Sequence, residues 1–156
     1  MLQRTFLQTS TSMPAEKKVP NQTFIDTLFV IALINPRDQY HAKATALAAQ
    51  FENSGLLTTD AVLLEIGNGL ARNYKQEAIE VIEDFFSSEE AEIVRLDSQL
   101  FERAFDLYKR YKDKSWGLID CISFIVMTDA GITEALTFDQ HFEQAGFKAL
   151  MAEDGV

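Results

Sequence analysis

The chain has 156 residues, 47% of them hydrophobic, a length and composition that predict one globular domain with a substantial core. Its 24 acidic and 14 basic residues give a net charge of −10, which argues against binding nucleic acid through basic side chains alone. Cys121 is the only cysteine, so an internal disulfide is excluded and a reducing cytoplasm is the expected location. No apolar run approaches the roughly 18 residues that a membrane-spanning helix needs.

Residues 1–20 carry three basic side chains and one acidic side chain, and they lack the apolar centre of a secretory signal. We expect them to form a flexible extension, with residues 21–152 forming the folded domain. A weak targeting leader and a true start at Met13 are alternative explanations of the same stretch.

The first half of the chain alternates short apolar runs with helical patterns. Asp26 directly follows the first run, and Pro36 ends the first helix because the residue before a proline avoids the helical conformation. Thr59 or Asp60 is expected to cap the helix that carries Glu65 beside its apolar face. In chain order, we predict a strand at 23–25, helices at 27–35 and 40–51, a strand at 56–58, a helix reaching residue 70, and a helix at 76–86.

The second half contains the most apolar helix. Asp120 opens an apolar run that continues to Met127, and Gly131 is suited to end this helix because glycine tolerates the left-handed conformation. Asp139 directly follows the fourth apolar run. In chain order, we predict a strand at 92–96, a helix at 98–112, a buried helix at 118–130, a strand at 134–138, a short helix after Asp139, and an edge strand at 147–150.

Strands that are separated by one or two helices predict an α/β fold, with a parallel sheet covered by helices on both faces. In such folds ligands bind beyond the carboxyl ends of the strands. Asp26 and Asp139 each follow a strand. We therefore expect these two acids to lie at the same edge of the sheet.

Four carboxylates are the candidate functional residues, and each has an ordinary alternative explanation. Asp26 and Asp139 are also suited to cap the helices that follow them, and Asp120 occupies a position where the helix dipole favours an anion. Glu65 is equally compatible with a solvent-facing position. Their convergence favours a joint role, because strand ends place two of them and helices that flank the sheet place the other two.

Clustered carboxylates repel one another strongly unless they share protons or bind a cation. A site made only of oxygen ligands favours Mg²⁺ or Mn²⁺. Such an ion polarises a phosphoryl oxygen and lowers the pKa of bound water. The four acids therefore predict a divalent metal site for phosphodiester hydrolysis.

The chain from about residue 24 to 150 resembles a PIN domain, and it is most similar to the VapC-type toxins of toxin–antitoxin pairs. Three stretches carry the resemblance, TFIDTLFVIALIN, TTDAVLLEIGNGLAR and SWGLIDCISFIVMTDAGITEALTFDQHFEQAGF. The acidic quartet of the family falls on Asp26, Glu65, Asp120 and Asp139, and Thr137 matches a polar position beside that quartet. Gly117 departs from the pattern, since relatives often have Ser or Thr there, so the cap of the Asp120 helix is expected to be weaker.

The resemblance implies a three-layer α/β/α sandwich around a parallel sheet of four or five strands. It also implies an endoribonuclease that depends on Mg²⁺ or Mn²⁺, a homodimer and a cognate antitoxin protein. Two alternatives stay open: an RNA-processing nuclease outside any toxin pair, and a PIN-type binding module without catalysis. The helices at 76–86 and 98–112 carry more aromatic surface than a small core can bury. This excess suggests a contact with a second copy of the chain or with an antitoxin.

Basic side chains are candidates for RNA contacts. Lys112 and Lys114 belong to a basic segment before Trp116, which a solvated helix end explains as well as RNA or an acidic partner does. Arg72 is expected on the Glu65 helix, in contact with a phosphate or in a surface salt bridge. Cys121 is expected in the core, and His41 and His141 have no partner at ligand spacing, with His141 expected to be exposed.

Overall fold

A computed structural model describes residues 21–153, and the extension expected at 1–20 lies outside these residues. Five parallel strands form one sheet in the order β3-β2-β1-β4-β5. At its centre, Phe24 of β1 is paired with Leu57 of β2 on one side and with Ala135 of β4 on the other. The strands are β1 (Thr23–Ile25), β2 (Leu56–Thr59), β3 (Ala91–Val94), β4 (Glu134–Leu136) and β5 (Lys148–Ala149).

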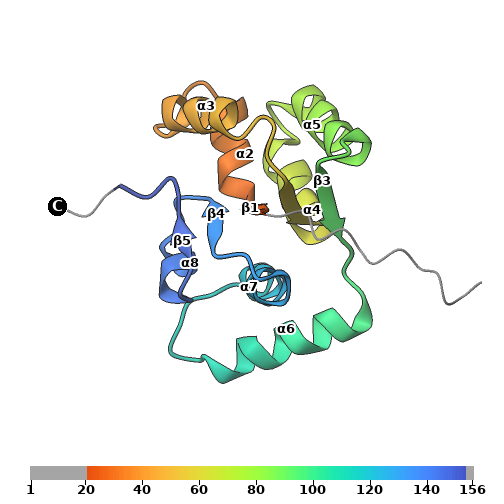
Figure 1. The fold of residues 1–156 in the computed structure, drawn as a ribbon, viewed down its shortest axis with the longest axis vertical. Helices are drawn as coiled ribbons and strands as arrows, with labels where there is room; N and C mark the ends of the chain where they lie inside the picture. Colours follow the sequence, from red (N-terminus) through yellow and green to blue (C-terminus); the bar gives the residue numbers. More distant parts are fainter. Residues whose placement is uncertain (1–20, 154–156) are drawn as a thin grey trace, which may run out of the picture.

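Helices cover both faces of the sheet and complete a three-layer sandwich. Figure 1 shows α2, α3 and α5 on one side of the sheet and α6 and α7 on the other, with α7 between the sheet and α6. The predicted α/β/α fold with a parallel sheet is thus confirmed. The helices are α2 (Thr27–Ile34), α3 (His41–Gln50), α4 (Asp60–Leu70), α5 (Lys75–Ser87), α6 (Ser98–Arg110), α7 (Leu118–Ala130) and α8 (Gln140–Gln144).

Local sequence explains where several helices begin and end. The Thr59 hydroxyl accepts the N–H of Val62, and a carboxylate oxygen of Asp97 accepts the N–H of Leu100, so both residues act as N-caps. Gly131 ends α7 with a φ of 69°, the left-handed conformation that glycine adopts without strain. Gly131 was predicted from residue type alone, and Thr59 was one of the two predicted caps of its helix, with Asp60 as the other.

β4 is shorter than the sequence predicts and ends at Leu136 instead of residue 138. The N–H of Thr137 donates to the carbonyl oxygen of Ala135, 3.1 Å away, which turns the chain out of the sheet. The apolar pattern continues through Phe138 because that side chain stacks on Tyr40, with ring centroids 3.9 Å apart. Phe138 is therefore packed without belonging to the strand.

The order of the strands creates a crevice at the carboxyl edge of the sheet. The chain moves from β1 to β2 and β3 in one direction, and the remaining strands lie on the other side of β1. Between β1 and β4 the direction of winding changes, and parallel α/β sheets bind ligands at such a point. Asp26 and Asp139 follow these two strands.

The helices of the described residues are all too short or too polar to cross a membrane.

A candidate metal centre at the sheet edge

A cleft of about 540 Å³ opens at the carboxyl edge of β1 and β4. All four carboxylates that the sequence singles out line it: Asp26, Glu65, Asp120 and Asp139. They come from the end of β1, from α4, from the first turn of α7 and from the residue before α8. Leu28, Ile31 and Ile119 supply apolar wall beside them.

Asp26 is the most deeply buried of the four acids, with 5% of its surface exposed. It occupies the N-cap position of α2, yet its side chain makes no capping hydrogen bond. Its Oδ2 instead accepts the Thr137 hydroxyl at 2.8 Å. Burial raises the pKa of Asp26 to about 7, and the charges of Asp120 and Glu65 add to this effect. The capping explanation for Asp26 therefore does not describe the structure.

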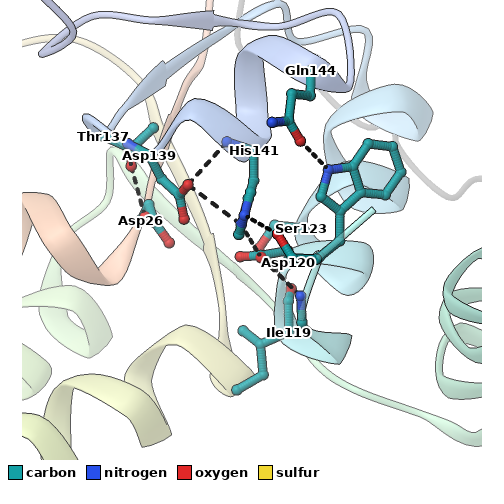
Figure 2. A network of polar contacts seen from close by, with 11 residues as sticks. Asp26, Ile119, Asp120, Ser123, Thr137, Asp139, His141 and Gln144 are labelled. Carbon is teal, nitrogen blue, oxygen red and sulfur yellow. Dashed lines mark hydrogen bonds and ion pairs between the residues drawn. The ribbon is translucent and has the colours of Figure 1, made fainter. Parts of the chain in front are cut away.

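Thr137 links two of the acids. Its hydroxyl donates to Asp26 and accepts the backbone N–H of Asp139 at 3.1 Å (Figure 2). Because Thr137 is fully buried, its contact with Asp26 is shielded from water. The threonine thus fixes the end of β1 relative to the segment that carries Asp139.

Glu65 enters the cleft from α4. Its Oε1 accepts the Thr27 hydroxyl at 2.9 Å, which ties the side chain to the first residue of α2. Partial burial raises the pKa of Glu65, and the charges of Asp120 and Asp139 raise it further. Glu65 therefore does not face solvent as an ordinary surface residue of α4.

Asp120 lies at the third position of α7 and caps its own helix. Its Oδ2 accepts the N–H of Gly117 at 3.0 Å, which is one half of a capping box; the other half is missing because Gly117 has no side chain. Burial is the main cause that raises the pKa of Asp120, against the hydrogen bonds from Gly117 and His141. As expected, the N-cap lacks the side-chain hydrogen bond that Ser or Thr would supply, and Asp120 satisfies the N–H of Gly117 alone.

His141 belongs to this site, and the prediction that it is an exposed residue without partners is wrong. Its side chain is 20% exposed, and its Nδ1 lies 3.0 Å from Asp120 Oδ2 and 3.4 Å from Asp139 Oδ1 (Figure 2). Its backbone N–H donates to Asp139 at 2.9 Å, so Asp139 caps α8 and positions His141 in the first turn. The spacing Asp139-Gln140-His141 at a helix start is the sequence signal for this contact.

The other ring nitrogen of His141 faces Ser115. The distance from Nε2 to the Ser115 hydroxyl oxygen is 3.1 Å. With Nδ1 protonated, the imidazole donates to Asp120 and accepts from Ser115. His141 therefore connects the acids with the segment between α6 and α7.

The basic residues that were predicted to contact RNA lie outside the acidic cleft. Arg72 is exposed in the turn after α4 rather than on the helix, which ends at Leu70. Within residues 21–153 it forms no ion pair, so the surface salt bridge that was expected as an alternative is absent there. Lys112 and Lys114 line a separate cleft that also contains Ser115.

Cys121 follows Asp120 but points into the core, as predicted. It is fully buried, and burial raises the pKa of its thiol to about 11. A thiol that stays protonated near neutral pH is a poor nucleophile. Among the described residues, the chemistry of this region therefore rests on oxygen and imidazole groups.

The donor set fits a divalent cation. Asp120, Asp139 and His141 each offer one ligand atom, and these atoms lie within 4.8 Å of one another. Asp26 is buried beside two other acids, Asp120 and Glu65, and the side chain that donates a hydrogen bond to it, Thr137, is a neutral hydroxyl. Carboxylate oxygens suit Mg²⁺ and Mn²⁺, and the imidazole nitrogen suits Mn²⁺ better than Mg²⁺.

The fold is that of an α/β protein with a parallel sheet. Its site is an acidic cleft suited to a cation, at the point where the winding of the sheet changes direction. The sequence profile of the PIN domain matches residues 23–148, and the chain belongs to this family. The recognition drawn from the sequence motifs is thus confirmed.

Relatives of known structure or activity cover nearly the same region. The 23S rRNA-specific endonuclease VapC20 of Mycobacterium tuberculosis, from strains CDC 1551 and H37Rv, is 30% identical over 130 residues, which are 83% of this chain and 98% of VapC20. The crystal structure of VapC20, described as a toxin that cleaves the sarcin–ricin loop, matches with a TM-score of 0.73 and 29% identity over 81% of this chain and 96% of that one.

A more distant structural match supports the fold alone. It is VapBC2 from Rickettsia felis, bound to a DNA fragment from their promoter. The TM-score is 0.58 and the identity is 16%, over 83% of this chain and 97% of the other.

Proposed function

We propose that this protein is a metal-dependent endoribonuclease that hydrolyses phosphodiester bonds of RNA. The observation that supports this proposal most strongly is the cleft at the sheet edge, which is lined by carboxylates from four separate parts of the chain. A relative with 30% identity is named as an endonuclease specific for 23S rRNA, which favours a structured ribosomal RNA as the substrate class.

We propose that Asp26, Glu65, Asp120 and Asp139 hold Mg²⁺ or Mn²⁺. When bound, such an ion would supply a Lewis acid for the phosphoryl oxygen and a lowered pKa for water. The raised pKa values of Asp26, Glu65 and Asp120 support this assignment, because a nearby cation would favour their ionised forms.

The neighbouring side chains hold the acids in position. Thr137 donates to Asp26 and Thr27 donates to Glu65, so each hydroxyl leaves one carboxylate oxygen free of that contact. With its Nδ1 protonated, His141 donates to Asp120 Oδ2, the oxygen that also accepts the N–H of Gly117. Fixed carboxylates bind a cation with less loss of side-chain entropy than mobile ones.

Substitution of the acids tests the proposal. Asp26→Asn and Asp120→Asn should each reduce Mg²⁺-dependent cleavage of ribosomal RNA by at least about 100-fold, because each removes a charged ligand while keeping the side-chain shape. Asp84→Asn, on the exposed side of α5, is the matched control and should retain activity. EDTA should abolish cleavage by the wild-type protein. Full activity of either site variant, or cleavage that persists in EDTA, would refute the role.

We also propose that the protein acts in the cytoplasm as the toxin of a toxin–antitoxin pair, as a homodimer that a cognate antitoxin inhibits. The description of VapC20 as a toxin supports this. Large apolar side chains on α5 and α6 are exposed to 42–55%, including Ile79, Phe86, Phe101 and Phe105, and they offer surface for such partners. A non-catalytic binding module would instead bind Mn²⁺ without cleaving RNA.

A further inference from the structure

A second cleft, of about 400 Å³, lies where α6 passes into the segment before α7. Aromatic and basic side chains alternate around it: Tyr108, Tyr111 and Trp116 with Lys109, Lys112 and Lys114. We name it the aromatic–basic cleft. None of the four carboxylates of the metal centre lines it.

The charge of this region is opposite to that of the whole chain. Residues 106–116 contain four basic and two acidic side chains, whereas the net charge of the protein is −10. The two acids form exposed ion pairs, Asp106 with Lys109 at 3.2 Å and Asp113 with Lys114 at 3.6 Å. Such exposed pairs are weak and exchange readily for a phosphate.

The helix dipole does not explain all of these bases. Cations are favoured in the last turn of a helix, and Lys109 and Arg110 occupy the last turn of α6. Lys112 and Lys114 lie beyond Arg110, where the helix has ended. Lys112 forms no ion pair with any residue in 21–153, so its charge is available to a ligand.

The aromatic side chains form a fixed surface. Trp116 is 8% exposed and its indole N–H donates to Gln144 at 3.0 Å, while its ring meets Phe124 edge to face. Tyr111 packs on Trp116 with ring centroids 4.9 Å apart, yet remains 38% exposed. A rigid aromatic ring with an exposed face, beside lysines, is the arrangement on which bases of single-stranded nucleic acid stack.

One side chain joins this cleft to the metal centre. Ser115 lines the aromatic–basic cleft and contacts Nε2 of His141, whose Nδ1 contacts Asp120. A nucleotide in the cleft would therefore lie only one imidazole away from the acids. A single RNA strand has the continuity and the charge to occupy both clefts.

We propose that the aromatic–basic cleft binds a nucleotide of single-stranded RNA next to the cleaved bond, with its base on Tyr111 and a phosphate between Lys112 and Lys114. The inference rests on the proposed ribonuclease function for the class of ligand. It explains how an acidic protein holds RNA: the metal centre accepts one phosphate, and this cleft supplies the positive charge for the next.

Binding of a labelled single-stranded RNA to the full-length Asp26→Asn protein, in Mg²⁺ and at several salt concentrations, tests the inference without cleavage. Tyr111→Ala should raise the Kd about 5- to 100-fold, and Tyr111→Phe should restore it. Lys112→Ala combined with Lys114→Ala should raise the Kd and flatten the salt dependence by about 1 in the log–log slope. Lys75→Ala, an exposed lysine at the start of α5, is the control and should leave the slope unchanged.

The outcomes separate this inference from the ribonuclease proposal. Unchanged Kd and salt slope in the double lysine variant overturn the inference, and so does an equal loss in Lys75→Ala, even when the wild-type protein cleaves RNA. The same variants can also be tested for binding of an acidic peptide. If they bind the peptide more weakly but bind RNA as the parent protein does, the inference is also overturned. RNA binding that depends on Tyr111 and the two lysines, in a protein that never cleaves RNA, supports the cleft and refutes the nuclease.

Discussion

At Asp26, burial and negative charge coincide. An isolated carboxylate in such a place is costly, and a hydroxyl from Thr137 offsets only part of that cost. The pKa of about 7 means that the folded protein binds a proton here more tightly than the unfolded chain, whose pKa is near 3.8. Ionised Asp26 therefore destabilises the metal-free protein as pH rises through this range.

This linkage predicts how Asp26→Asn changes stability. In EDTA, the free energy of unfolding should rise in the variant, by little near pH 4 and by up to about 4 kcal/mol at pH 8, because the amide is neutral throughout. Urea unfolding at pH 5, 6, 7 and 8 measures this. Glu83→Gln, on the exposed side of α5, serves as the control without a pH-dependent gain. A gain of equal size at pH 5 and pH 8 would contradict the burial of the charge.

His141 is predicted to hold Asp120 in the orientation that binds a cation. His141→Ala should weaken Mn²⁺ binding about 10- to 100-fold, while His141→Asn, which places an amide N–H where Nδ1 lies, should keep most of the affinity. Titration calorimetry gives the affinities, and thermal unfolding shows whether either variant is destabilised. Equal losses in both variants would instead make the imidazole itself a ligand, and unchanged affinity in both would remove His141 from the site.

At the scale of single elements, the parts of α7 have clearly different roles. Its first turn carries Asp120, its middle fills the core, and Gly131 ends it with a φ of 69°. A β-carbon at Gly131 would meet no atom within 4 Å, so the cost of a side chain there comes from the backbone alone.

Gly131→Ala should therefore lower the free energy of unfolding by about 1–2 kcal/mol, and Gly131→Asn by less. Urea unfolding measures both. Gly67→Ala is the matched control within α4, because its β-carbon would make only an ordinary contact with Ile82 at 4.0 Å. That change should instead stabilise the protein by about 0.5–1 kcal/mol. Stabilisation in both variants would rule out strain at Gly131.

Helix α6 shows what periodicity leaves undecided. Its spacing predicts a helix correctly, and Leu100 and Ala104 are buried as the pattern requires. Phe101, Phe105 and Tyr108 follow the same spacing, yet they are exposed and stack on one another. An apolar pattern identifies a surface that avoids water, but the partner that covers it is not part of the pattern.

For the whole molecule, the sheet and the four-acid cleft were predictable because both follow from short-range signals. Asp26 directly follows β1 and Asp139 lies just beyond the turn after β4, and parallel winding brings the ends of these strands together. The contacts of His141 were not predictable in the same way. Its partners Asp120 and Ser115 lie 21 and 26 residues away, and they meet it only because the turn at Thr137 sets the direction of α8.

The distribution of charge over the molecule was also only partly predictable from the sequence. Acids gather where strands end, and bases gather beyond α6, on the far side of His141. The sequence shows both groups of charges but not the distance between them. That distance depends on how α7 and α8 pack, because His141 of α8 contacts Asp120 of α7 between the two groups.

The winding of the sheet also draws the carboxylates of the proposed metal centre from two separate parts of the chain. Asp26 and Glu65 precede β3, whereas Asp120 and Asp139 follow α6. A cut in the short connection from Val94 to Ser98 would give two fragments, each with two of the four carboxylates. Neither fragment alone would be toxic under the proposed function, and nuclease activity would return only on reassembly. Each fragment could therefore be fused to a different protein, and nuclease activity would then report that the two fusion proteins have bound to each other.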